Sequence, residues 1–131
     1  MPNLVEYDDA PAEVRAVYDE IKAARNIPDV TNFWKAIANH PPTLRRTWDS
    51  LREVMGPGAL DPLTKELLYL AVSAANGCGY CTASHTAAAR AKGMTPEMLG
   101  EVIAIVAMAA ETNRLAETWR VPLDAPYATL P

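Results

Sequence analysis

The sequence has few side chains that could carry out covalent chemistry. Of its 131 residues, only two are cysteines and two are histidines. It contains no Gly-x-Gly-x-x-Gly segment and no P-loop, so no motif indicates a bound flavin or nucleotide. We therefore expect no cofactor, and any redox chemistry should depend on the cysteines and on a reductant from outside the chain.

Long apolar runs and an excess of positive charge are also missing. The longest apolar run covers the nine residues 102–110, which is too short to span a bilayer. The net charge of −4 argues against a nucleic-acid partner or an anionic membrane surface. No basic segment followed by an apolar run opens the chain, so we expect no signal peptide and a cytoplasmic protein.

The remaining pattern predicts an all-α fold of about six helices. No strand-like alternation, internal repeat or low-complexity segment is present. Half of the residues are hydrophobic and 21% are charged, which is typical of a folded globular chain. We expect a single domain, 1–131, made of an N-terminal helical arm (1–57), an active-site helical core (58–120) and an irregular tail (121–131).

Proline, glycine and capping residues set the expected helix limits. The predicted helices cover residues 11–25, 33–37, 42–55, 62–76, 78–92 and 96–119. Asp61 and Thr95 each precede a proline and are expected N-caps. His40 is expected to interact with the C-terminus of the short second helix. Residues 56–58, Gly-Pro-Gly, are expected to interrupt the chain.

The last predicted helix is apolar on all sides between residues 102 and 110. A helix of this kind is normally buried all round, yet a chain of 131 residues has little interior in which to bury it. We therefore expect its surplus apolar face to contact another subunit of a homo-oligomer.

Both cysteines and one histidine lie in a single stretch, residues 76–85. At about 100° per residue, a helix that starts near Cys78 brings Cys78, Cys81 and His85 within about 60° of one another. The free N–H groups of a first helical turn and a nearby histidine both favour a thiolate. The stretch therefore predicts a lowered pKa for Cys81, with Cys78 in reach to form a disulfide.

Three interpretations of this stretch stay open on pattern alone. The cysteines could be a redox pair, or small core residues beside a core histidine. They could also bind zinc with His85, but the only further ligands would be His40 and scattered carboxylates. Two cysteines three residues apart favour catalysis or metal binding in a reducing compartment over a structural disulfide.

The arrangement of these residues resembles a known family. Glu66 is followed after eleven residues by Cys78-Gly-Tyr-Cys81, and after three more by His85. This spacing resembles the alkylhydroperoxidase D-like proteins of the carboxymuconolactone decarboxylase superfamily. The segments 62–66 (Pro-Leu-Thr-Lys-Glu), 95–97 (Thr-Pro-Glu) and 113–116 (Asn-Arg-Leu-Ala) extend the resemblance over residues 40–120.

The resemblance implies a thiol peroxidase or disulfide reductase that assembles as a trimer or hexamer. It implies that Cys81 is the cysteine that reacts with a hydroperoxide, that Cys78 is its resolving partner, and that Glu66 and His85 relay protons. The helical pattern alone puts Glu66 on the border of a buried stripe, where it would be solvated. As a relay base it would have to be partly buried, with a pKa raised toward neutrality if no cation lies beside it.

The resemblance also implies an external reductant, either a lipoyl-type dithiol or a thioredoxin-like protein. The best-known peroxidase members have a histidine where this chain has Tyr80, and a phenol is a poor base at neutral pH. Two alternatives remain. One is a carboxymuconolactone decarboxylase-like enzyme acting on a small lactone or carboxylate, and the other is a non-catalytic helical oligomer.

Overall fold

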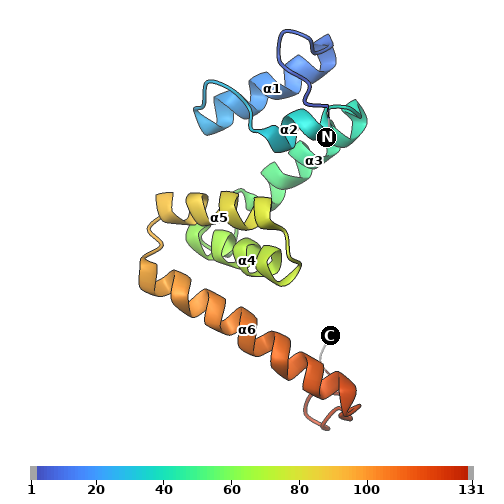
Figure 1. Cartoon of the computed structure of the whole chain (residues 1–131), viewed down its shortest axis with the longest axis vertical. Helices are drawn as coiled ribbons and strands as arrows, with labels where there is room; N and C mark the ends of the chain where they lie inside the picture. Colours follow the sequence, from blue (N-terminus) through green and yellow to red (C-terminus); the bar gives the residue numbers. More distant parts are fainter. Residues whose placement is uncertain (1–2, 130–131) are drawn as a thin grey trace. The chain divides into compact units, whose positions relative to one another are not determined.

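The computed structural model describes residues 3–129, which form six α-helices and no β-strand (Figure 1). The helices are α1 (Ala12–Arg25), α2 (Asn32–Ile37), α3 (Pro41–Met55), α4 (Pro62–Ala75), α5 (Gly79–Ala91) and α6 (Pro96–Thr118). The predicted all-α fold is confirmed. Residues 1, 2, 130 and 131, which belong to the predicted arm and tail, lie outside the described part.

The N-caps expected at the starts of α4 and α6 are present. The Asp61 carboxylate accepts the N–H of Thr64 at 3.0 Å, and the Thr95 hydroxyl accepts the N–H of Met98 at 3.2 Å. One expectation was wrong: His40 is not at the C-terminus of α2 but is the N-cap of α3, where its Nδ1 accepts the N–H of Thr43 at 3.3 Å. Because only three residues separate α2 from α3, one residue can be assigned to either helix end by pattern alone.

The chain divides into two compact units, one up to Gly56 and one from Pro57 onward. This boundary falls within the Gly-Pro-Gly segment that the sequence predicts as a break. The behaviour of the chain as one domain, with an arm and a core, stays a prediction.

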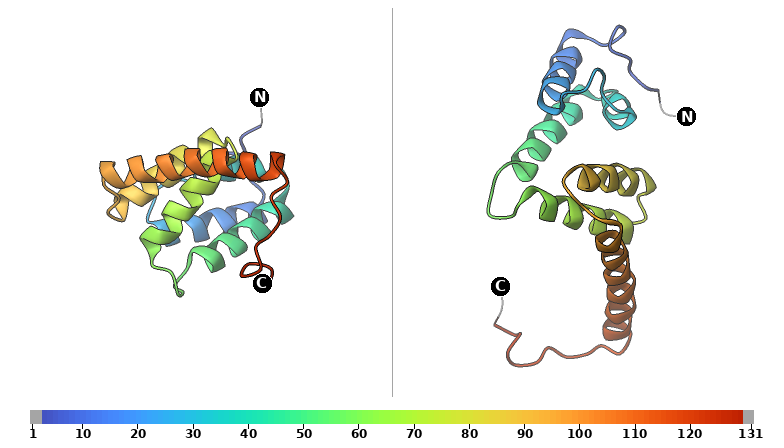
Figure 2. Two further views of the ribbon diagram at one scale, coloured as in Figure 1. Left: turned by 90° about the horizontal axis from the view of Figure 1, so that it is seen from below. Right: turned by 90° about the vertical axis from the view of Figure 1, so that its left-hand side faces the viewer.

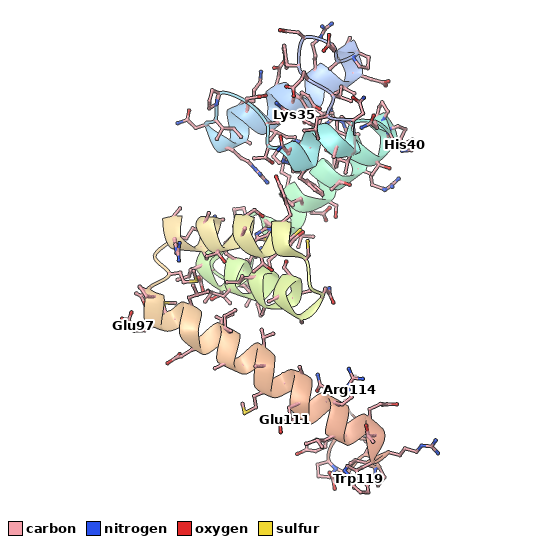
Figure 3. The ribbon with its side chains drawn as sticks, in the orientation of Figure 1. Lys35, His40, Glu97, Glu111, Arg114 and Trp119 are labelled. Carbon is pink, nitrogen blue, oxygen red and sulfur yellow. The ribbon has the colours of Figure 1, made fainter. Side chains whose placement is uncertain are left out.

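The first unit packs α1, α2 and α3 around an aromatic core. Trp34 and Trp48 meet edge to face, with ring centroids 5.7 Å apart. Lys35, labelled in Figure 3, is buried in the same unit, and its Nζ pairs with Glu6 at 2.6 Å and with Asp29 at 2.7 Å. The fully buried members of the core are Val14, Tyr18, Ile21, Leu44 and Trp34.

The second unit is built on the pair α4 and α5, which lie side by side (Figures 1 and 2). The turn between them is tight because Gly77 adopts a left-handed conformation, with φ +71°. The N–H of Gly77 bonds the carbonyl of Ala74 and the N–H of Cys78 bonds that of Ser73, which closes α4 in a Schellman motif. Cys78, the last residue of this motif, is also the N-cap of α5.

Helix α6 packs only its first half on this pair. Met98, Leu99 and Val102 contact the small core formed by Leu70 and Ala89, with further contributions from Met94, Leu63 and Leu67. The second half, toward Glu111, Arg114 and Trp119, stands away from α4 and α5 (Figures 1 and 3). No residue of α6 is fully buried within the described chain. Between residues 3 and 129, no helix combines the length and the apolar character needed to cross a bilayer.

Candidate active site

The structure brings together Glu66 of α4 and His85 of α5, which are 19 residues apart in sequence. The Glu66 Oε2 atom lies 2.7 Å from the His85 Nδ1 atom. Glu66 is only 6% exposed, so the solvated position suggested by the helical pattern was wrong, and the burial expected of a relay residue is present. A carboxylate at Nδ1 favours the tautomer with the proton there and leaves Nε2 as the acceptor.

A third residue, Lys92, completes this group and was not predicted. It follows α5 as its C-cap, and its Nζ lies 2.9 Å from the Glu66 Oε1 atom. Burial raises the pKa of Glu66, but the hydrogen bonds from His85 and Lys92 outweigh it, so the pKa lies below its usual value. The expected raised pKa was therefore wrong, because it assumed a carboxylate without a cationic neighbour.

Tyr69 packs on the face of the His85 ring and was also missed. Its ring is stacked on the His85 imidazole, with centroids 3.7 Å apart and planes 19° apart. Burial is the main reason why the pKa of Tyr69 is raised, with smaller contributions from Cys81 and Cys78, so the two sulfurs lie within electrostatic range. Tyr69 comes three residues after Glu66, and this helical neighbour spacing could have indicated it.

The two cysteines differ in the way their thiols ionise. The Cys78 sulfur caps α5 and accepts the N–H of Cys81 at 3.3 Å. The pKa of Cys78 is lowered, first by a hydrogen bond from the Cys81 thiol and then by that backbone N–H. The pKa of Cys81 is raised, because its thiol donates to Cys78 and because it is more buried. The predicted low pKa of Cys81 was therefore wrong: of the two cysteines, Cys78 is the one whose pKa is lowered.

This difference between the two pKa values predicts which cysteine reacts first with an alkylating agent. Near neutral pH, iodoacetamide is expected to label Cys78 roughly fivefold or more faster than Cys81, because only the thiolate is nucleophilic. Peptide mass spectrometry after short exposures measures both rates in one sample. In the Cys78→Ser variant, which removes the main cause of the raised Cys81 pKa, labelling of Cys81 should begin at lower pH than in the native chain. Equal rates at the two positions in the native chain would contradict the assignment.

Comparison with known proteins supports the resemblance seen in the sequence. Residues 42–124 match the carboxymuconolactone decarboxylase family. The chain belongs to this family. The fold also matches the crystal structure of the alkylhydroperoxidase AhpD core from Rhodospirillum rubrum, with a TM-score of 0.85 and 53% identity, over 90% of this chain and 88% of that one.

Two proteins similar to this chain are named alkyl hydroperoxide reductase AhpD. The protein from Azorhizobium caulinodans is 34% identical over 122 residues, which cover 82% of this chain and 64% of the relative. The protein from Solibacter usitatus is 39% identical over 72 residues, which cover 55% of this chain and 39% of the relative. This chain therefore spans less than two thirds of either relative's length.

In this family member both cysteines are present as free thiols. Within residues 3–129, no group of three or more His, Cys, Asp or Glu side chains is arranged to hold a metal ion. The reactive groups of the site are a thiol pair, a histidine and a carboxylate that is hydrogen-bonded to a lysine.

Proposed function

We propose that this chain reduces hydroperoxides through Cys81 and Cys78, with His85 and Glu66 as its proton relay. The observation that supports the proposal best is the thiol pair at the start of α5, with the Glu66–His85 hydrogen bond of 2.7 Å beside it. The names of the two relatives and of the solved core point to the same activity.

The first step is the ionisation of Cys81, which is a thiol at rest. His85 follows Cys81 by one helical turn, so its Nε2 can accept the thiol proton while Glu66 holds Nδ1. The Cys81 thiolate then attacks the distal oxygen of the hydroperoxide, and the O–O bond breaks. Cys81 becomes a sulfenic acid, and the departing alkoxide takes the proton from His85 and leaves as an alcohol.

The second step uses the low pKa of Cys78. Its thiolate attacks the sulfenic sulfur of Cys81, the S–O bond breaks, and the hydroxide leaves as water with a proton taken up from solvent, since His85 gave its own proton to the alkoxide. The product is a Cys78–Cys81 disulfide. Two electrons from an external dithiol, either lipoyl-type or thioredoxin-like, restore the pair. Such a cycle suits the reducing environment of the cytoplasm.

The assay that tests this proposal follows hydroperoxide consumption with dihydrolipoamide as reductant. The chain is expected to consume peroxide catalytically and to accumulate an intramolecular disulfide when the dithiol runs out. Two results together would contradict the function. One is peroxide consumption no faster than that of dihydrolipoamide without the chain, and the other is the same lack of acceleration with reduced thioredoxin as the reductant. Tyr80 stands beside Cys81 in this site, and no step of the mechanism requires it to act as a base.

We also propose that the chain works as a homo-oligomer, a trimer or a hexamer, through the apolar side of α6. Ile105 and Met108 on this helix are 59% and 61% exposed in the isolated chain. Apolar side chains of this size, gathered on one helix, are usually covered by a partner.

The oligomer gives a further prediction. Ile105→Asp together with Met108→Asp is expected to convert the assembly to monomers of about 14 kDa, because a buried charge without a partner opposes association. Light scattering at micromolar concentration measures the mass, and circular dichroism checks that helix is retained. A native chain that is already monomeric would refute the proposal.

A further inference from the structure

We propose that Lys92 is a positioning residue of this site: it fixes the Glu66 carboxylate against His85 and offsets its charge, so that His85 stays available as a proton acceptor. The catalytic part of this inference rests on the proposed function. Its structural and electrostatic part concerns the Lys92–Glu66–His85 group alone.

The geometry gives each oxygen of Glu66 its own partner. Oε1 lies 2.9 Å from the Lys92 Nζ and Oε2 lies 2.7 Å from the His85 Nδ1. The Glu66 side chain is 8% exposed, while that of Lys92 is 39% exposed. The carboxylate therefore cannot rotate without losing a charge-assisted hydrogen bond in a place with little water to replace it.

The charges give Lys92 a second effect. A buried carboxylate next to an imidazole favours the imidazolium ion, which cannot accept another proton. The ammonium group of Lys92 balances the negative charge of Glu66 and opposes a second positive charge on His85. Lys92 thus favours the neutral ring that the proposed first step requires.

The other titratable groups around the His85 ring do not neutralise the Glu66 carboxylate in place of Lys92. Tyr69 stacks on the His85 ring, and Cys78 and Cys81, which lie within electrostatic range of Tyr69, can contribute only negative charge. Helix α6, which packs on α4, carries Glu97 and Glu101 in its first turns, and both of these side chains are exposed. The cation that bonds Glu66 is Lys92.

The side chain of Lys92 can be changed without removing the end of α5. Its backbone N–H, not its ammonium group, closes the helix on the carbonyl of Ala89 at 3.0 Å. Arg90 offers a matched control, since it carries the same charge in the last turn of α5 and is exposed. Arg90→Met removes a cation from this helix end while it leaves the bond to Glu66 in place.

The test is an NMR titration of the histidine rings in the full chain. The only other histidine, His40, lies in the first unit and serves as an internal reference. In Lys92→Met, the titration midpoint of the His85 ring is expected to move to higher pH by roughly half a unit or more, while that of His40 stays unchanged. Lys92→Arg should remain near the native midpoint, and so should Arg90→Met. Lys92→Gln is a second neutral variant, for use if Lys92→Met does not fold.

A His85 midpoint within about 0.2 units of native in both neutral variants would overturn the inference, and so would an equal shift in Arg90→Met. Peroxide turnover adds a second readout: in Lys92→Met the rise of activity with pH should move upward, and activity at high pH should approach that of the native chain. If the native chain consumes no peroxide, the proposed function fails, while the NMR result still decides the role of Lys92.

Discussion

Cys81→Ser is expected to abolish peroxide turnover, whereas Cys78→Ser is expected to stop after one oxidation. A serine hydroxyl at position 81 cannot be oxidised by peroxide, so the first step is lost and activity should fall by about 10³-fold or more. With serine at position 78, Cys81 still attacks peroxide but no second thiol resolves it. A sulfenic acid should then persist on Cys81.

A probe specific for sulfenic acid, followed by mass spectrometry, locates the oxidised sulfur in each variant. Ala83→Ser, an exposed change on the same helical turn, is a suitable control and should turn over normally. Because the pKa of Cys78 is lowered, the experiment must also test the opposite assignment, in which Cys78 attacks the peroxide and Cys81 resolves it. If Cys81→Ser accumulates a sulfenic acid on Cys78 and Cys78→Ser does not react, the roles assigned to the two cysteines are exchanged.

Glu66→Gln is expected to lower peroxide turnover by about 10²-fold, the usual scale of acid–base assistance. The amide keeps the size of the side chain but removes the charge that Lys92 and the Nδ1–H of His85 both bind. It can also present its NH₂ group to Nδ1, which favours the tautomer with the proton on Nε2. The ring would then hold a proton where it must accept one.

Steady-state rates over a range of pH measure this effect, with Glu101→Gln on the exposed side of α6 as the matched control. The Glu66→Gln chain should still form the Cys78–Cys81 disulfide with a strong oxidant, since the sulfurs themselves are unchanged. Turnover within about twofold of native at every pH would remove Glu66 from the relay.

The fold was predictable because its limits depend on local sequence. Asp61 and Thr95 hold the first turns of α4 and α6 through hydrogen bonds within three residues of themselves. Gly77 supplies the positive φ that ends α4. Signals of this kind are read from a few neighbouring residues, and they fixed the elements even where a shared boundary, as at His40, was assigned to the wrong helix.

The site was only partly predictable because its energetics depend on contacts between helices. Helical periodicity predicts which residues of α5 share a face, but it does not predict which side chains of α4 contact that face. Lys92 lies 26 residues from Glu66, and only the packing of α4 on α5 brings the two together. The same limit explains why the pKa of Glu66 was predicted in the wrong direction.

Cys78 has two tasks whose energies are linked: it is a member of the thiol pair and the cap of α5. As a thiolate it accepts hydrogen bonds from Cys81 that a disulfide sulfur cannot retain with equal strength. Whatever stabilises the dithiol more than the disulfide raises the reduction potential of the couple. In the proposed cycle, the start of α5 would therefore make the oxidised pair a better electron acceptor for an external dithiol of more negative potential.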